Sequence, residues 1–262
     1  MSALAVFLAL LIGITLGLLG GGGSTLTVPV FVYALGYDPK LAIAMSLPVV
    51  GGASLVGAIR HWRLGNIDLR TAVPFGLAAM AGAFGGAQLA RFLSGRTQLM
   101  IFAVVLAAAA ITMFRNAQRQ EPAVRAEATG ERATAAGERA KRMPWLLVAG
   151  VATGTLTGIV GVGGGFMMVP ALVLLGGVPM KKAVGTSLLV IATNTATAYA
   201  GYHEVVDVPW NVVISFGLVT VVGIFVGAAF IRRVPQQVLK RAFALLLIAI
   251  ALLIFWQNRS LF

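Results

Sequence analysis

A glycine-rich segment that occurs twice decides the fold of this chain. Residues 17–29 are GLLGGGGSTLTVP and residues 158–170 are GIVGVGGGFMMVP. Each segment lies inside a long apolar stretch, and four glycines within five or fewer positions disfavour a continuous helix. We expect a helix break in each segment, facing protein or a water-filled cavity, because irregular backbone is tolerated at membrane depth only there.

The two segments belong to a duplication that covers nearly the whole chain. A shift of 141 residues aligns positions 13–114 with 154–255 without a gap and gives 28 identical pairs. The informative pairs are residue types that an apolar composition does not produce by chance: Pro29 with Pro170, Lys40 with Lys181, Ser46 with Ser187, and Arg91 with Arg232. We infer that the two halves share an ancestor.

The composition predicts an all-α integral membrane protein. Hydrophobic residues make up 59% of the chain and the mean hydropathy is +0.93. The 20 basic and 8 acidic residues lie between the apolar runs, because a charge at the bilayer centre costs a few kcal/mol or more. The runs are at about 1–36, 41–59, 71–90, 98–114, 144–177, 183–202, 210–231 and 242–256. Most are near the roughly 20 residues that span a membrane, and the first lacks the basic start of a cleaved signal, so we expect a retained helix.

Three regions follow from this pattern. Residues 1–114 form the first membrane repeat, residues 115–143 a charged linker, and residues 144–262 the second repeat. The linker has almost nothing apolar to bury, so we expect solvated chain or a loose helix. Its seven basic residues outnumber its four acidic ones, which places it in the cytoplasm by the positive-inside rule.

The charged loops predict that the repeats have inverted topology. Lys181 and Lys182 fall inside and the loop with Glu204 outside, whereas Arg60 marks an inside loop at the position that aligns with the Glu204 loop. The loop with Arg91 fits less well, because its arginines would lie outside. Both chain termini are then extracytoplasmic.

This topology requires that residues 1–36 and 144–177 each enter and leave the membrane by the same face. Each would fold back at its glycines, and each second arm has about 12 residues, or roughly 18 Å of helix, which is too short to span. We therefore expect each repeat to be a broken or re-entrant helix hairpin followed by three transmembrane helices.

The breaks are the predicted substrate site. The arm after each break would begin with free backbone N–H groups and the positive end of a helix dipole, which suits an anion. The predicted site residues lie at the breaks and on the helix that follows each of them: Gly22, Gly23, Ser24, Thr25, Met45, Ser46, Gly163, Gly164, Gly165, Phe166, Thr186, Ser187 and Asn194. Phe166 aligns with Thr25, so we expect the first half to bind the anion more strongly. Four other glycines are expected to serve helix packing: Gly82, Gly86, Gly223 and Gly227.

Two roles are open for the side chain of Asn194. Serine and threonine hydroxyls can bond back to their own helix, so most of them are expected to be silent. An asparagine amide cannot satisfy itself in lipid and should contact either a neighbouring helix or the solute.

His61 and His203 lie near equivalent helix ends, and Glu204 is adjacent to the second. They could relay protons, but the favoured interpretation is that they are interfacial residues beside the aromatic anchors Trp62 and Trp210. The spans contain no carboxylate for a deep proton or sodium site.

Other functions lack the residues they need. The chain has no cysteine and two histidines, so we expect neither a metal centre nor a cofactor. The net charge of +12 is suited to anionic lipid headgroups, because its basic residues flank apolar spans, and we expect no nucleic acid partner. No phosphate-binding loop or activated nucleophile is present, so the chain is not expected to be an enzyme. The oligomeric state stays open, with a homodimer as one option.

The duplicated glycine-rich turn followed by proline, together with RHWRLGNID at residues 60–68, resembles the TauE/SafE sulfite exporter family. The resemblance covers both halves. It implies a bacterial inner-membrane transporter that exports sulfite, sulfoacetate or another small sulfur-containing anion. A carrier of divalent metal cations and a passive anion channel are the alternatives, and the absence of acidic or imidazole groups within the spans disfavours the cation.

Overall fold

The computed structural model describes residues 2–117, 132–160, 165–202, 207–230 and 234–257, and these residues contain helices and turns but no strand. Six helices in this part of the chain are long and apolar enough to cross a membrane: Pro39–Arg63, Leu69–Ala90, Gly95–Thr112, Met143–Val160, Trp210–Phe230 and Gln237–Gln257. The shorter apolar helices are Ala3–Leu19 and Gly23–Ala34. The prediction of an all-α membrane protein is confirmed.

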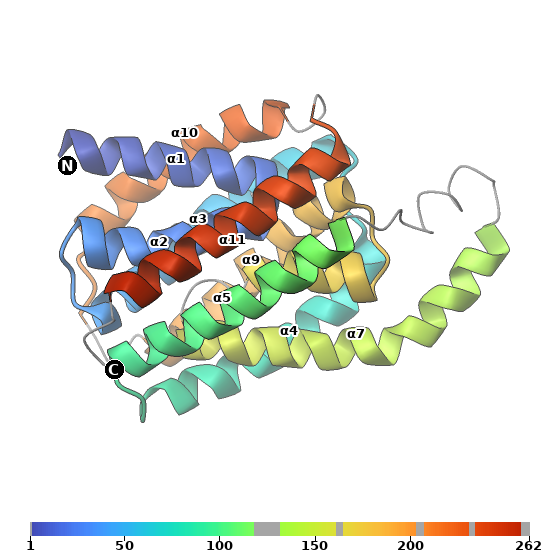
Figure 1. The fold of residues 1–262 in the computed structure, drawn as a ribbon, viewed down its shortest axis with the longest axis horizontal. Coiled ribbons are helices and arrows are strands. Elements are labelled where there is room, and N and C mark those ends of the chain that lie inside the picture. The colour runs from blue at the N-terminus through green and yellow to red at the C-terminus, as the bar shows by residue number, and fades with distance from the viewer. Residues whose placement is uncertain (1, 118–131, 161–164, 203–206, 231–233, 258–262) are drawn as a thin grey trace.

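The first half contains α1 (Ala3–Leu19), η1 (Gly20–Leu26), α2 (Thr27–Pro29), η2 (Val30–Ala34), α3 (Pro39–Arg63), α4 (Leu69–Ala90) and α5 (Gly95–Ala117). The second half contains α7 (Arg132–Val160), α8 (Gly165–Pro170), η3 (Ala171–Leu175), α9 (Met180–Tyr202), α10 (Trp210–Phe230) and α11 (Gln236–Gln257). The N-terminal part of α7 extends beyond the bundle in Figure 1.

The local structure of the two halves repeats as closely as their sequences. A one-turn π-helix follows Pro29 in the first half and Pro170 in the second. The Leu35 N–H donates to the carbonyl of Val30 at 3.0 Å, and the equivalent bond from Gly176 to Ala171 is 3.1 Å. The next residues, Gly36 and Gly177, both have positive φ, which glycine adopts without strain. The short arm after each break therefore ends in the same turn.

Each half packs its first helix against the other half. α1 lies along α10 at one side of the bundle and α4 lies along α7 at the other (Figure 1). A Cβ at Gly82 or Gly86 would overlap the backbone of α7, and one at Gly223 or Gly227 would overlap the backbone of α1. These four glycines allow the helices to approach closely, so the prediction that they serve packing is confirmed.

The centre of the bundle is the contact between α3 and α9, which are equivalent in the duplication. A Cβ at Gly51 would lie 2.6 Å from Thr195 Oγ1, a Cβ at Gly57 would lie 3.2 Å from Leu188 Cδ1, and Gly185 packs against His61. The residue numbers rise along α3 as they fall along α9, so these helices run antiparallel. Antiparallel equivalent helices are what inverted repeats require, and the inverted topology across a membrane stays a prediction.

The first hairpin turns at a single residue. Gly20 has φ of 63° and its N–H caps α1 by donating to the Leu16 carbonyl. Gly23 then packs back against the backbone of Thr15 and Leu16. The helix break expected in the first segment is therefore confined to Gly20, because the chain resumes right-handed bonding directly after it and forms the 3-10 helix η1. In the second half α7 ends at Val160 and α8 begins at Gly165, and the residues between them, where the equivalent break is expected, lie outside the described ones.

Candidate functional site

The two glycine breaks touch each other. A Cβ added to Gly21 would overlap the backbone of Gly165, and a Cβ added to Gly165 would overlap Gly21 and the Cδ1 atom of Ile191. On the other side, a Cβ at Gly20 would lie 2.8 Å from Ser187 Oγ. The breaks are therefore pressed together against one face of α9, with no room for side chains between them.

The point of contact lies at mid-depth in the bundle. Ile191 is 11 residues from Met180 and 11 residues from Tyr202, the two ends of α9. At the helical rise this is roughly 16 Å from either end, about half the thickness of the hydrocarbon core. Both breaks thus reach the middle of a crossing helix.

Asn194 lies beside this contact and has no hydrogen-bond partner. Its exposed fraction is 0%, and among the described residues neither its Nδ2 nor its Oδ1 atom finds a partner. Ser187 and Ile191 precede it at helical spacing, so Asn194 shares the face of α9 that contacts the breaks. Leaving buried donors and acceptors unsatisfied costs about 1–3 kcal/mol each, so this amide is suited to a polar ligand.

Two further hydroxyls are buried without a partner in the part of the chain that the structure describes. They belong to Thr27, in the arm that returns from the first break, and to Ser54 on α3. The α3–α9 contacts place Asn194 level with Gly52, so Ser54 is about two residues, or roughly 3 Å of helix rise, from the same level. The centre of the bundle thus offers uncharged hydrogen-bonding groups from α2, α3 and α9.

No charged site accompanies these groups. Within the described ranges, His, Asp and Glu side chains nowhere gather in a group of three or more that could hold a metal ion. The sequence also has no cysteine. The chemistry at the centre is hydrogen bonding by amide and hydroxyl groups.

Three predicted serines donate to carbonyls of their own segment. The Oγ of Ser24 donates to Gly21 O at 2.7 Å, that of Ser46 to Ile43 O at 2.8 Å, and that of Ser187 to Val184 O at 2.9 Å. Their hydroxyl hydrogens are committed to the backbone, as expected for serines in membrane helices. Ser187 still lies against Gly20, so it shapes the break by packing.

The remaining predicted residues have different roles. Thr186 Oγ1 accepts a hydrogen bond from the backbone N–H of Asp68 at 2.9 Å and so ties α9 to the loop after α3. Thr25 and Met45 are fully buried. Gly22 lies in η1 between the two break residues that make contacts.

Some predicted residues lie outside the described ones: Gly163, Gly164, His203 and Glu204. The side chain of Phe166 is likewise not described, although its backbone belongs to α8. Their roles stay predictions.

His61 is buried inside the bundle, in the last turn of α3, and its interpretation as a residue at the membrane interface stays a prediction. Its exposed fraction is 0%, whereas that of the neighbouring Trp62 is 55%. Its Nε2 atom lies 3.3 Å from the carbonyl oxygen of Gly17, near the end of α1, and Nδ1 has no partner among the described residues. A Cβ at Gly185 would lie 3.0 Å from the Cβ of His61, so the glycine at this position leaves room for the histidine.

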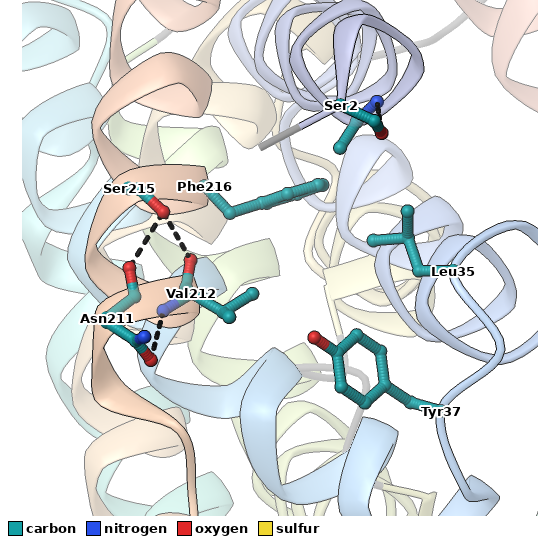
Figure 2. A pocket seen from close by; sticks show the side chains of 8 residues that line it. Ser2, Leu35, Tyr37, Asn211, Val212, Ser215 and Phe216 are labelled. Carbon is teal, nitrogen blue, oxygen red and sulfur yellow. Dashed lines mark hydrogen bonds between the residues drawn. The ribbon is translucent and has the colours of Figure 1, made fainter.

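A cavity of about 270 Å³ opens at the end of the bundle where α1 and α10 begin (Figure 2). Its lining comes from α1, the turn after η2, and α10: Ser2, Ala5, Leu35, Tyr37, Asn211, Val212, Ser215 and Phe216. Neither this cavity nor the roles of Thr27 and Ser54 could be predicted from the residue pattern. The only signal for the cavity was a set of polar residues at the ends of apolar runs, which is where polar residues occur in any membrane protein.

Comparisons with known proteins give the class of this bundle of apolar helices, that of the membrane transporters. The chain is 30% identical over 253 residues to a probable membrane transporter protein of Xylella fastidiosa (strain 9a5c), covering 95% of this chain and 92% of the relative. It is 28% identical over 239 residues to the probable membrane transporter protein YdhB of Bacillus subtilis (strain 168), covering 91% and 94%. No solved structure matches significantly.

The match to a family is more specific. Residues 5–254 match the sulfite exporter TauE/SafE family, and the chain belongs to that family. The resemblance inferred from the glycine-rich turns is thereby confirmed over nearly the whole chain.

Proposed function

We propose that the chain is a secondary transporter that exports sulfite or a small organosulfonate anion, such as sulfoacetate, by alternating access between inverted repeats. The observation that carries this proposal is the unpartnered amide of Asn194, fully buried at mid-depth beside the two glycine breaks. A site that binds and releases its solute has unsatisfied groups when it is empty, and a structural helix contact does not.

The chemistry of the site favours an anion over a cation. A sulfonate group has only acceptor oxygens, so it needs donors, and the Asn194 Nδ2 and the hydroxyls of Thr27 and Ser54 can all donate. A divalent metal ion prefers carboxylate or imidazole ligands, which do not gather in the described part of the chain. Uncharged donors also hold an anion weakly enough to release it on the far side.

In this proposal the linker is cytoplasmic, both termini are extracytoplasmic in a bacterial inner membrane, and His61 couples transport to protons. His61 is a buried titratable group near the first break. Its Nε2 atom contacts the carbonyl oxygen of Gly17, which lies three residues before Gly20. Protonation of Nδ1 would place a charge at the base of the hairpin. His203 and Glu204 would serve the equivalent place in the second half.

Ligand-dependent thermal stability of the purified protein tests the proposal. We expect sulfite and sulfoacetate to raise the unfolding temperature, and Asn194→Ala to remove most of this rise. The control is Thr193→Ala, which changes the neighbouring, exposed side chain of the same helix and should leave the rise intact. Stabilisation by Ni²⁺ or Co²⁺ and by no sulfur anion would instead establish a cation carrier. Counterflow in proteoliposomes separates a carrier from a passive channel.

A further inference from the structure

The cavity at the beginning of α1 and α10 is lined by uncharged polar groups and by aromatic rings. Figure 2 shows the hydroxyl end of Tyr37 directed toward the α10 side of the cavity, where Asn211 and Ser215 lie. The Asn211 Oδ1 accepts from the N–H of Val212 at 3.0 Å, which leaves its Nδ2 as a donor on that side. The cavity therefore offers the same kind of chemistry, neutral donors, as the central site.

Three aromatic rings that contact one another lie between the cavity and the interior. Phe31 packs edge-on against Tyr37, with ring centroids 6.0 Å apart, and at a tilt against Phe216, with centroids 4.9 Å apart. Tyr37 and Phe216 line the cavity, while Phe31 is fully buried behind them. Phe31 is thus the innermost ring of this cluster.

Thr27 precedes Phe31 on the same face of the returning arm. It is four residues earlier in the returning arm, which is about one helical turn or roughly 6 Å. Its buried hydroxyl has no partner among the described residues. One further turn leads to Ser24 and to the contact between the breaks. The returning arm therefore leads from the cavity, past Phe31 and Thr27, to the central site.

The positions equivalent to the aromatic cluster are closed by apolar side chains. Leu172 and Val178 replace Phe31 and Tyr37, and Phe75 on α4 is the equivalent of Phe216. All three are at most 2% exposed. Leu146, the equivalent of Ala5 in the cavity lining, is also buried there and contacts Gly176. The two ends of the bundle therefore differ: one has a polar cavity over an aromatic cluster and the other has a packed apolar core.

We propose that this cavity is an outer subsite for the transported anion, and that Phe31, held by Tyr37 and Phe216, is the gate between the subsite and the central site. This inference rests on the proposed function for the identity of the solute. An aromatic ring is suited to the role because it excludes water when stacked and can rotate away about two side-chain bonds. In the structure this gate is closed.

The natural absence of cysteine makes the gate directly testable, since single-cysteine variants have no labelling background. In intact cells, a membrane-impermeant methanethiosulfonate reagent is applied to Ser215→Cys and to Thr27→Cys. We expect Ser215→Cys to react and Thr27→Cys to be protected. Adding Phe31→Ala should raise the labelling rate of Thr27→Cys by at least about tenfold, because two ring contacts that hold the gate closed are lost together.

Leu172→Ala is the matched control, since it truncates the equivalent buried residue of the other half. It should leave Thr27→Cys protected from the external reagent. Labelling of Ser215→Cys in the Phe31→Ala background verifies that the variant is folded. Rapid labelling of Thr27→Cys with Phe31 intact would overturn the gate, and so would continued protection in Phe31→Ala. An unreactive Ser215→Cys would overturn the outer location of the cavity.

Solute protection tests the subsite separately. Sulfoacetate should slow the labelling of Ser215→Cys at least about tenfold at saturation, while chloride at equal ionic strength should not, because only a bound ligand occludes the thiol. Equal labelling rates with both salts would overturn the subsite. The labelling of Thr27→Cys is measured without solute, so a working gate without any sulfur-anion binding would reject the proposed function and retain the gate.

Discussion

Replacing the central amide by an apolar side chain of similar size should make the protein more stable and less able to bind its solute. In Asn194→Leu both unpartnered polar atoms disappear from a fully buried position. If each unmade hydrogen bond costs at least roughly 1 kcal/mol, the free energy of unfolding should rise by about 2 kcal/mol. A hydrogen bond to a charged ligand is worth about 1.5–3 kcal/mol, so the anion should bind roughly ten- to a hundredfold more weakly.

Unfolding in detergent, with and without sulfoacetate, measures both effects in one assay. Thr193→Leu is the control, because this exposed neighbour should change stability by less than about 0.5 kcal/mol and leave binding unchanged. A loss of more than about 1 kcal/mol in Asn194→Leu would show that the amide bonds another helix, since a partner would then be left unsatisfied. In that case Asn194 would be an interhelical contact and the reasoning for the central site would be refuted.

Three other substitutions test the packing and the coupling. Gly86→Ala should lower the free energy of unfolding by about 1–3 kcal/mol, because its Cβ would overlap the backbone of α7. The control is Gly85→Ala on the same helix, whose Cβ meets open space and should be tolerated. Equal losses of stability in the two variants would contradict the close packing. Gly21→Ala should abolish transport or reduce the folded yield by separating the breaks, and wild-type flux would argue against their contact. His61→Gln keeps a donor near the position of Nε2, so the fold should persist while flux in proteoliposomes loses its pH dependence; unchanged pH dependence would exclude His61 as the coupling group.

The sequence determined the class and the repeat structure of this protein. Charges confined to the ends of the apolar runs and the segments between them predict the spanning helices, because a charge buried in hydrocarbon is costly in any fold. The duplicated glycine segments predicted a break in each half, since glycine clusters disfavour helix wherever they occur. The equivalent turns after Pro29 and Pro170 show that local sequence was sufficient for local structure.

Only the tertiary structure decided which side chains meet. Thr193 is exposed and Asn194 is fully buried, yet both are polar residues in the same apolar helix. In a soluble protein the apolar face of a helix indicates its orientation, but in a bilayer the lipid-facing and buried faces are both apolar, so periodicity does not encode rotation. The inward turn of His61, the contact between Gly21 and Gly165, and the unpartnered amide of Asn194 all depend on that rotation and on helices distant in sequence.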